Sequence, residues 1–336
     1  MVFSIPDIRD QRVLITGGLG FIGSNLAHRL VASGAKVVLY DALLPQYGGN
    51  MAAIEEIEKK VKVVHSDVRD LDALAKEVRD CEVIFNCAAQ ASHTESMVNP
   101  FLDLEINCIG NLNLLEAARK FNDDARIVYA GTRSQVGSMM YKPVDEDHPE
   151  FSRDIYSANK SAAEKYHLIY HSAYGMYTTC MRITNAYGPR AQVKNPGYGV
   201  VNFFIGLALR EKEISVYAPG QQTRDLIYVE DVVNALMTGA YNPNANGEAF
   251  FVGSGKEIRL LDLAKKISTL AGTGKVTEIP WPDERKKLEV GDVSVDIRKI
   301  ADRLGWVPLT TIDEGLRTTL DFYRQNLWKY IFGDWS

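Results

Sequence analysis

Alternation between two kinds of segment in the first half of the chain limits the possible folds most strongly. Short runs rich in β-branched residues lie at residues 12–16, 36–40, 61–65, 82–87 and 126–130. Longer stretches with apolar residues at helical spacing separate them, including residues 21–33 and 99–120. This alternation predicts a parallel sheet joined by helices. The runs are apolar without strict alternation, which is typical of strands covered by helices on both faces. The sequence therefore predicts an α/β fold built on a doubly wound parallel sheet.

The pattern becomes less regular after Tyr156. It predicts a helix over 155–174, a strand over 177–183 and a final helix over 312–325, with short strands and helices between them. We expect residues 1–175 to form a first domain that also takes strands from about 177–185 and 225–242. Residues 186–330 then form most of a smaller, mixed α/β domain. A chain of 336 residues has room for both.

Composition excludes several classes of protein. The 38 Lys and Arg against 43 Asp and Glu give a net charge of −5, which provides no electrostatic basis for nucleic-acid binding. No apolar run approaches the roughly 20 residues that span a bilayer, so no membrane association is expected. The four cysteines, Cys81, Cys87, Cys108 and Cys180, lack metal-site spacing and are typical of reduced thiols. We therefore expect a cytoplasmic protein without a metal site.

A glycine-rich turn joins the first strand to the first helix. Gly17, Gly20 and Gly23 have the spacing G-x-x-G-x-x-G, with Phe21 and Ile22 between the last two. Glycines here permit a tight turn, a close approach of pyrophosphate to the backbone, and packing of the helix on the strand. The helix N-terminus then offers unpaired N–H groups to the phosphates. The turn predicts a Rossmann-type dinucleotide site.

Acidic residues follow the second and third strands. Asp41 ends the second strand, where a carboxylate accepts hydrogen bonds from an adenosine ribose and repels a 2′-phosphate. This favours NAD over NADP as the cofactor. Asp67 and Val68 follow the third strand and have two interpretations of equal weight: contact with the adenine, or capping of the helix that begins after Asp70.

Tyr156 and Lys160 form a Tyr-x-x-x-Lys pair near the start of a helix. A spacing of four places both side chains on one face. A nearby ammonium group favours the phenolate, so the pair predicts that Tyr156 acts as a base near neutral pH. The motif is weak alone and gains force from its place after the fifth strand.

Four segments in this order, TGGLGFIG, YSANK, RITNAYGPR and TRDLIYVED, resemble the extended short-chain dehydrogenase/reductase family. The resemblance is to its nucleotide-sugar epimerase/dehydratase branch, similar to UDP-glucose 4-epimerase, and extends to about Tyr323. It implies that Tyr156 is the acid/base, that Lys160 binds the nicotinamide ribose, and that Thr132 binds the reacting hydroxyl, with Ser134 as the alternative. It also implies that the cofactor is bordered by three further residues, Ala88, Ala89 and Asn107.

The residues after Thr132 bear on the reaction. The dehydratases of this family have Asp and Glu there, whereas this chain has Arg133 and Ser134. Without that carboxyl pair, a 4-epimerase with a transient 4-keto sugar is favoured. A dehydratase, a 2-epimerase, a reductase and a non-catalytic NAD sensor remain alternatives. Arg133 has two interpretations: pairing with the carboxylate of a uronic acid, or a surface contact with Asp145 or Glu146.

The resemblance also implies where the nucleotide sugar, expected to be a UDP-sugar, binds. Diphosphate contacts are expected from Asn185, Arg224 and Arg285, with a salt bridge to Asp225 or Asp231 as the alternative role of Arg224. The nucleotide base is expected near Val216 and Tyr217, and the sugar near Gln90, with His93 a less favoured neighbour. Val293 takes the place of a bulky Tyr that restricts the sugar pocket in some members. A homodimer through residues 100–120 and 155–174 is expected.

Overall fold

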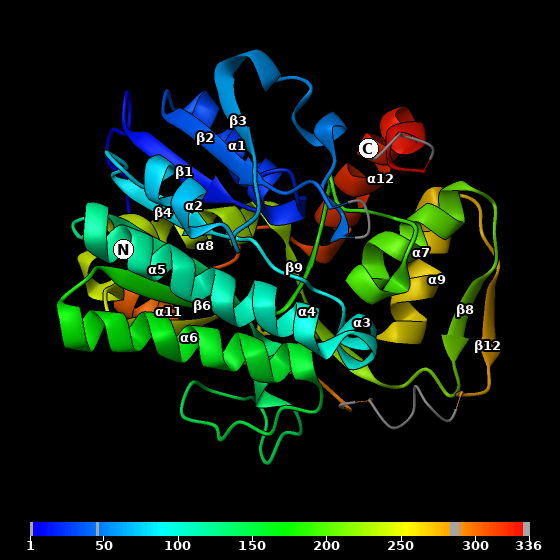
Figure 1. The fold of residues 1–336 in the computed structure, drawn as a ribbon. Coiled ribbons are helices and arrows are strands. Elements are labelled where there is room, and N and C mark those ends of the chain that lie inside the picture. The colour runs from blue at the N-terminus through cyan, green and yellow to red at the C-terminus, as the bar shows by residue number, and fades with distance from the viewer. Residues whose placement is uncertain (1–2, 45–46, 283–288, 290, 332–336) are drawn as a thin grey trace.

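The computed structural model describes residues 3–44, 47–282, 289 and 291–331. Its central feature is a seven-stranded sheet with the order β10-β6-β5-β4-β1-β2-β3 (Figure 1). Every neighbouring pair of these strands is parallel. The strands are β1 (Arg12–Thr16), β2 (Lys36–Asp41), β3 (Val61–His65), β4 (Val83–Asn86), β5 (Arg126–Thr132), β6 (Thr178–Ile183) and β10 (Glu248–Val252).

Helices cover both faces of this sheet. One face packs against α1 (Phe21–Ala32), α8 (Val229–Tyr241) and α11 (Arg298–Leu304). The other packs against α2 (Leu71–Glu77), α5 (Gly110–Phe121) and α6 (Ile155–Tyr174). Successive residues of β1 serve the two cores, because Val13 and Ile15 join the first and Leu14 the second. The prediction of a doubly wound Rossmann-type sheet is confirmed.

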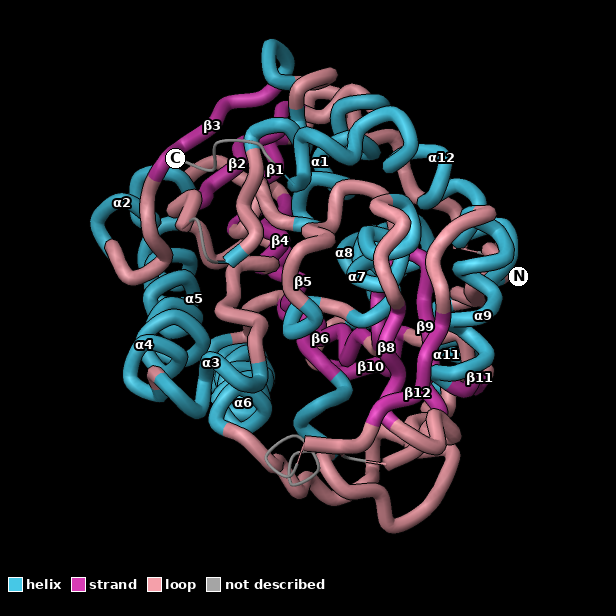
Figure 2. Tube along the Cα trace, turned by 90° about the vertical axis from the view of Figure 1, so that its right-hand side faces the viewer, coloured by secondary structure: helices cyan, strands magenta, loops and turns pink. Residues whose placement is uncertain are grey.

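A second, smaller unit stands beside the sheet. It contains α7 (Val200–Leu209), α9 (Leu260–Ala271), α12 (Ile312–Ile331) and the parallel pair β8 (Ile214–Tyr217) and β12 (Val276–Ile279). Its apolar core is separate and includes Phe204, Leu263 and Leu316. A three-stranded sheet of β7 (Asn185–Tyr187), β9 (Thr223–Tyr228) and β11 (Glu257–Arg259) accompanies it. In Figure 2, α2, α4, α5 and α6 lie on one side of the molecule, and α9, β8 and β12 lie on the other.

Two predictions about elements are corrected. Residues 225–242 add α8 to the first unit, not a strand of the central sheet, because β9 pairs with β7 and β11; the seventh strand is β10, which pairs with β6. The helix expected over 99–120 is present as one continuous helix, but it contains a π-helical turn at Glu105–Ile109 between α4 (Pro100–Leu104) and α5, which the sequence did not predict. The last helix continues past residue 325 to Ile331.

Short connecting elements complete the chain. The helix α3 (His93–Val98) follows β4, and 3₁₀ helices occupy Met51–Ile54, Glu58–Lys60, Arg133–Val136, Pro196–Tyr198 and Pro243–Ala245. Among the residues described, no helix combines the length and apolar character that crossing a bilayer requires.

Candidate active site

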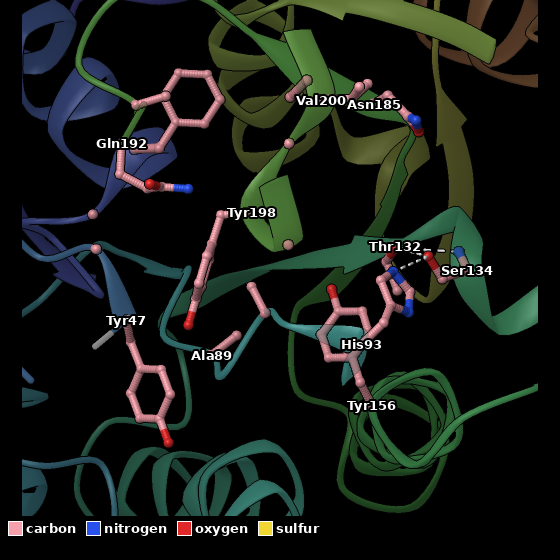
Figure 3. A pocket seen from close by; sticks show the side chains of 18 of the residues that line it. Tyr47, Ala89, His93, Thr132, Ser134, Tyr156, Asn185, Gln192, Tyr198 and Val200 are labelled. Carbon is pink, nitrogen blue, oxygen red and sulfur yellow. Dashed lines mark hydrogen bonds between the residues drawn. The ribbon is translucent and has the colours of Figure 1, made fainter. Parts of the chain in front are cut away.

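A large cavity opens at the carboxyl ends of the central strands, which is where ligands bind in open α/β sheets. Its volume is about 810 Å³, and residues of both units line it. The first unit contributes the glycine turn and the ends of β2, β4 and β5, while β7, β8 and β9 contribute from the other side. Figure 3 shows Tyr156, Thr132, Ser134 and His93 gathered at one side of this cavity, with Asn185 beyond them.

The glycine turn has the geometry that its spacing predicts. Gly17 has a φ of +66°, and a Cβ on it would lie 2.7 Å from the backbone nitrogen of Ala88. A Cβ on Gly23 would lie 2.2 Å from the carbonyl oxygen of Gly17. Gly20 is the N-cap of α1, and all three glycines line the cavity together with Phe21, Ile22, Ala88 and Ala89. The bare backbone and the helix N-terminus at the cavity wall fit the pyrophosphate of a dinucleotide.

Asp41 lies at the end of β2 on the cavity wall. Its two carboxylate oxygens accept the backbone N–H groups of Leu19 at 2.9 Å and Leu43 at 2.8 Å. Burial raises the pKa of Asp41, and these two hydrogen bonds oppose the increase. The same bonds tie the end of β2 to the glycine turn, so the carboxylate has a fixed place beside it.

Asp67 and Val68 also line the cavity, after β3. Asp67 binds the guanidinium of Arg69 at 2.8 Å. Burial alone would raise its pKa, but the bonds from Arg69 hold the pKa of Asp67 below its usual value. The capping interpretation is wrong, because Asp70 itself accepts the N–H of Ala73 at the start of α2.

The predicted reactive groups meet where β5 and α6 reach the cavity. Asp154 caps α6 by accepting the N–H of Ser157 at 2.8 Å, which brings Tyr156 in the first turn to the wall. Thr132 ends β5, and its hydroxyl donates to the Ser134 hydroxyl at 3.1 Å. Both hydroxyls line the cavity, so either of them is available to a sugar hydroxyl beside Tyr156.

Lys160 makes no hydrogen bond to Tyr156 among the described residues. It lies below the cavity wall, where its Nζ donates to the carbonyl oxygen of Ala130 at 2.8 Å and lies 4.2 Å from the centre of the Tyr129 ring. Burial lowers the pKa of Lys160 to about 8. Burial also raises the pKa of Tyr156, although a hydrogen bond with Thr132 and the positive charge of Arg133 both act to lower it. The structure therefore stabilises a neutral phenol, the opposite of the predicted direction, because desolvation outweighs the nearby charge.

His93 is a site residue that sequence reasoning underestimated. Its Nδ1 lies 2.7 Å from Asp154, its Nε2 lies 3.4 Å from the Ser134 hydroxyl, and its ring meets the Tyr156 ring edge-on at 4.9 Å. Burial alone would raise the pKa of Asp154, but the contact with His93 helps to hold that pKa below its usual value. The sequence contains no signal for this contact, because 61 positions separate His93 from Asp154.

Arg133 lies on the cavity wall and only 8% of it is exposed. Its side chain has no hydrogen bond or ion pair within the described part of the chain, and its Nη1 is enclosed without a partner. The surface interpretation is wrong: Asp145 accepts the Tyr141 hydroxyl, and Glu146 accepts the N–H of Phe251. Burial, together with the charge of Arg224, lowers the pKa of Arg133 to about 10.

Arg224 reaches the cavity from β9, as expected, but with a partner that was not anticipated. Its Nη2 pairs with Glu289 at 2.8 Å, whereas Asp225 and Asp231 accept backbone N–H groups elsewhere. Asn185, Val216 and Tyr217 line the same part, and the Tyr217 and Trp281 rings lie 4.6 Å apart. Arg285 lies outside the described residues.

Besides Lys160, three expected neighbours of the ligands do not reach the cavity wall. Gln90 is buried, and its amide binds the backbone of Ser92. Asn107 lies in the π-helical turn and donates to the carbonyl oxygen of Gln90 at 2.9 Å, so it supports the loop after β4 from behind. Val293 is fully buried beside β9, where its N–H binds Thr223, so it is not placed to restrict a sugar.

The glycine turn, the carboxylate that ends β2, and the Tyr156/Lys160 pair on α6 define a Rossmann-type enzyme of the short-chain dehydrogenase/reductase class. The chain belongs to the family whose model is described as GDP-mannose 4,6 dehydratase, which matches residues 14–319. Its relatives are named for several reactions on nucleotide sugars, as three comparisons illustrate.

A putative UDP-glucose 4-epimerase of Methanocaldococcus jannaschii is 33% identical over 317 residues, covering 94% of this chain and 99% of that protein. UDP-glucuronic acid decarboxylase 1 of Xenopus tropicalis is 31% identical over 328 residues, covering 94% of this chain and 73% of that protein. The structure of the UDP-glucose 4-epimerase of Thermus thermophilus in complex with NAD is 29% identical, with a TM-score of 0.82 over 94% of this chain and 99% of that one.

Proposed function

We propose that this chain is an NAD-dependent nucleotide-sugar 4-epimerase. It is an enzyme of the nucleotide-sugar epimerase/dehydratase family, and NAD is its cofactor. The residues that would hold NAD are those of the glycine turn, Asp41, Asp67, Val68, and Ala88 with Ala89. When bound, NAD would supply the acceptor and donor of a hydride, and its positive charge would favour the phenolate of Tyr156.

The residues around Tyr156 provide the remaining chemistry. Tyr156 takes the proton of the C4 hydroxyl as the C4 hydride leaves, which produces a 4-keto sugar, and later returns the proton. The hydrogen-bonded hydroxyls of Thr132 and Ser134 orient that oxygen. After the keto sugar turns in the cavity, the returning hydride reaches its other face.

The observation that carries this proposal is the state of the carboxylates on the cavity wall. Four line it among the described residues: Asp41, Asp67, Asp154 and Glu289. Each is already engaged, with two backbone N–H groups, Arg69, His93 or Arg224 respectively. Since elimination of water needs an acid and a base beside the sugar, this wall favours a reaction that needs only hydride and proton exchange at one carbon.

The nucleotide part of a UDP-sugar is assigned to the second unit. Arg224 offers its guanidinium to the diphosphate, in exchange for or in addition to Glu289, and Asn185 offers its amide. Val216 and Tyr217 border the base, and Tyr217 packs against Trp281. This division leaves the sugar beside Thr132, Arg133 and Tyr156.

A decarboxylase is the second candidate, because a relative carries that name and Arg133 is a cation beside the reacting groups. Decarboxylation also begins with oxidation of the sugar and needs no free carboxylate on the wall. A non-catalytic NAD sensor is less favoured, because such a protein has no need of Tyr156 beside two hydroxyls at the cavity.

We also propose a homodimer formed through α4, α5 and α6; in Figure 1, α4 and α5 follow one another and α6 lies beside them. Large apolar side chains on these helices are exposed, among them Phe101, Leu104, Ile169 and Tyr174. Burial of this face against a second copy would remove it from water.

The proposed activity is tested by incubating the NAD-loaded protein with UDP-, GDP-, dTDP- and CDP-sugars and following the products by NMR. An epimerase gives a C4 isomer of equal mass without added NADH. Loss of water or of carbon dioxide, or consumption of NADH, would instead identify a dehydratase, a decarboxylase or a reductase.

A further inference from the structure

Arg133 lines the cavity wall, and the proposed reaction gives this cation no task. It is nine-tenths buried, it follows Thr132 directly, and its Nη1 is enclosed with no partner among the described residues. A buried charged donor without a hydrogen bond is strongly unfavourable. Its position on the wall of a ligand cavity therefore points to a partner that arrives with the ligand.

The charges around Arg133 do not neutralise it. Arg224 adds a second positive charge nearby, and the neighbouring carboxylates, Glu289 and Asp154, pair with Arg224 and His93 instead. Tyr156 faces it as a phenol. Each neighbouring negative charge thus has its own partner, and Arg133 remains available to an anion.

We propose that Arg133 binds a carboxylate on the sugar itself, so that the substrates are nucleotide derivatives of acidic sugars such as a uronic acid. The assignment rests on the proposed function, because it takes the sugar to lie beside Tyr156. A guanidinium binds a carboxylate through two parallel N–H···O bonds.

The place of Arg133 favours the sugar over the diphosphate. It lies between Thr132 and Ser134 in the chain, the two hydroxyl residues that share a hydrogen bond beside Tyr156. The groups assigned to the diphosphate, Asn185 and Arg224, reach the cavity from β7 and β9. The two anionic parts of an acidic nucleotide sugar would therefore meet different cations.

The experiment compares UDP-glucuronic acid with UDP-glucose, which differ only at C6, where the first has a carboxylate and the second a hydroxymethyl group. Binding is measured by calorimetry on NAD-loaded protein carrying Tyr156→Phe, so that the bound sugar is not turned over. We expect UDP-glucuronic acid to bind about 10- to 100-fold more tightly, as a charge-assisted hydrogen-bonded pair provides. Adding Arg133→Gln should abolish this preference and leave the Kd of UDP-glucose unchanged.

Two further variants sharpen the comparison. Arg133→Lys keeps the charge without the planar pair of donors, so an intermediate preference is expected even if the Gln variant folds poorly. Arg9→Gln alters an exposed arginine that pairs with Asp7 before β1, and it should change neither Kd.

The assignment is overturned if UDP-glucuronic acid does not bind more tightly than UDP-glucose, if Arg133→Gln keeps the preference, or if both ligands weaken equally, which would place Arg133 at the diphosphate. Turnover is a separate readout on protein with Tyr156 intact. An acid preference with release of carbon dioxide, or with no C4 isomer, would contradict the proposed epimerisation while supporting the role of Arg133.

Discussion

Three polar side chains at the site are buried: Tyr156 and Arg133 lie on the cavity wall, and Lys160 lies just below it. Burial lowers the pKa of Lys160 and of Arg133 and raises that of Tyr156, so all three are pushed toward their neutral forms. A site that keeps charges in such surroundings lowers the stability of the fold for the sake of binding and chemistry. Each of these residues therefore has a measurable effect on stability or activity.

Lys160 makes the stability of the cofactor-free protein depend on pH. Its pKa falls from 10.5 to about 8 on folding. Below about pH 8 the lysine is charged in both the folded and the unfolded state, and the burial penalty of about 3 kcal/mol is fully present. Between about pH 8 and pH 10.5 the unfolded state binds more protons than the folded state, so the free energy of unfolding rises with pH. Lys160→Met should therefore unfold at higher urea than the parent at pH 7, and the difference should narrow toward pH 10.

The control for this prediction is Lys165→Met, which alters an exposed lysine on the same helix, α6. It should not produce a pH-dependent narrowing. Urea curves for the parent and Lys160→Met that stay parallel from pH 7 to pH 10 would contradict the effect of burial on Lys160.

Tyr156 is predicted to matter for turnover and not for folding. Tyr156→Phe removes the proton acceptor and should lower kcat by about 10²- to 10⁴-fold. Affinity for NAD should be retained, since the glycine turn and Asp41 are untouched. The turnover rate is measured by stopping the reaction at set times and quantifying the product by NMR, and the affinity for NAD is measured by titration. Full activity of the variant would refute the catalytic role.

The residues that the sequence indicated and those it did not differ in sequence separation. Gly17, Asp41 and Tyr156 were indicated by local spacing and by their order relative to strands. His93 with Asp154 and Arg224 with Glu289 are 61 and 65 positions apart, and only the fold brings them together. The direction of the Tyr156 pKa was also not predictable, because it depends on burial that spacing does not reveal.

At the scale of elements, the turn between β1 and α1 is the most constrained. A Cβ on Gly23 would lie 2.2 Å from the Gly17 oxygen and 2.9 Å from the Gly18 Cα, both of them backbone atoms. Gly23→Ala should therefore destabilise the protein by about 1–3 kcal/mol, as overpacking does, and weaken NAD binding. Thermal melting and NAD titration measure the two effects.

Gly20→Ala is a milder substitution in the same turn, because a Cβ on Gly20 would have one close neighbour, the Gly17 oxygen, at 3.2 Å. It should cost less stability than Gly23→Ala. An equal or reversed order would show that close packing of α1 on β1 does not govern this turn.

Elements with strong periodicity were predictable and interruptions of them were not. The bounds of α6, Ile155–Tyr174, follow from its sequence, with Asp154 as a capping residue before it and Gly175 after it. The π-helical turn at Glu105–Ile109 has no comparable signal. Its Asn107 makes a tertiary hydrogen bond to the carbonyl oxygen of Gln90, a contact that helical periodicity does not reveal.

At the scale of the whole molecule, the exposed apolar face over α4 and α6 predicts self-association. Phe101 is 76% exposed at the start of α4. Phe101→Glu places a charge on this face and should shift the protein toward the monomer mass in light scattering. Met140→Glu, at an exposed site outside these helices, should leave the mass unchanged. A monomeric parent, or a Phe101→Glu variant of unchanged mass, would contradict the proposed dimer.

The change in pattern after Tyr156 predicted a second unit, and the resemblance predicted that segments after it return to the first, but the returning strand is β10 and not one from residues 225–242. β10 joins the central sheet by a long-range pairing with β6. The strand β9 belongs to the three-stranded sheet, and α8, which follows it in the chain, packs against the central sheet. This exchange brings Arg224 and Asn185 to a cavity that the first unit begins.

The central claim is that hydride leaves and returns at C4 of a nucleotide sugar. It is tested most directly by supplying the NAD-loaded protein with UDP-glucose and UDP-glucuronic acid, each deuterated at C4, and following the label by NMR. We expect whichever of the two sugars binds to be converted to its C4 isomer. That isomer should keep its deuterium at C4 and its mass, and none of the label should appear in the solvent. Loss of the label to water, loss of water or carbon dioxide from the sugar, or absence of any C4 isomer from both sugars would contradict this account.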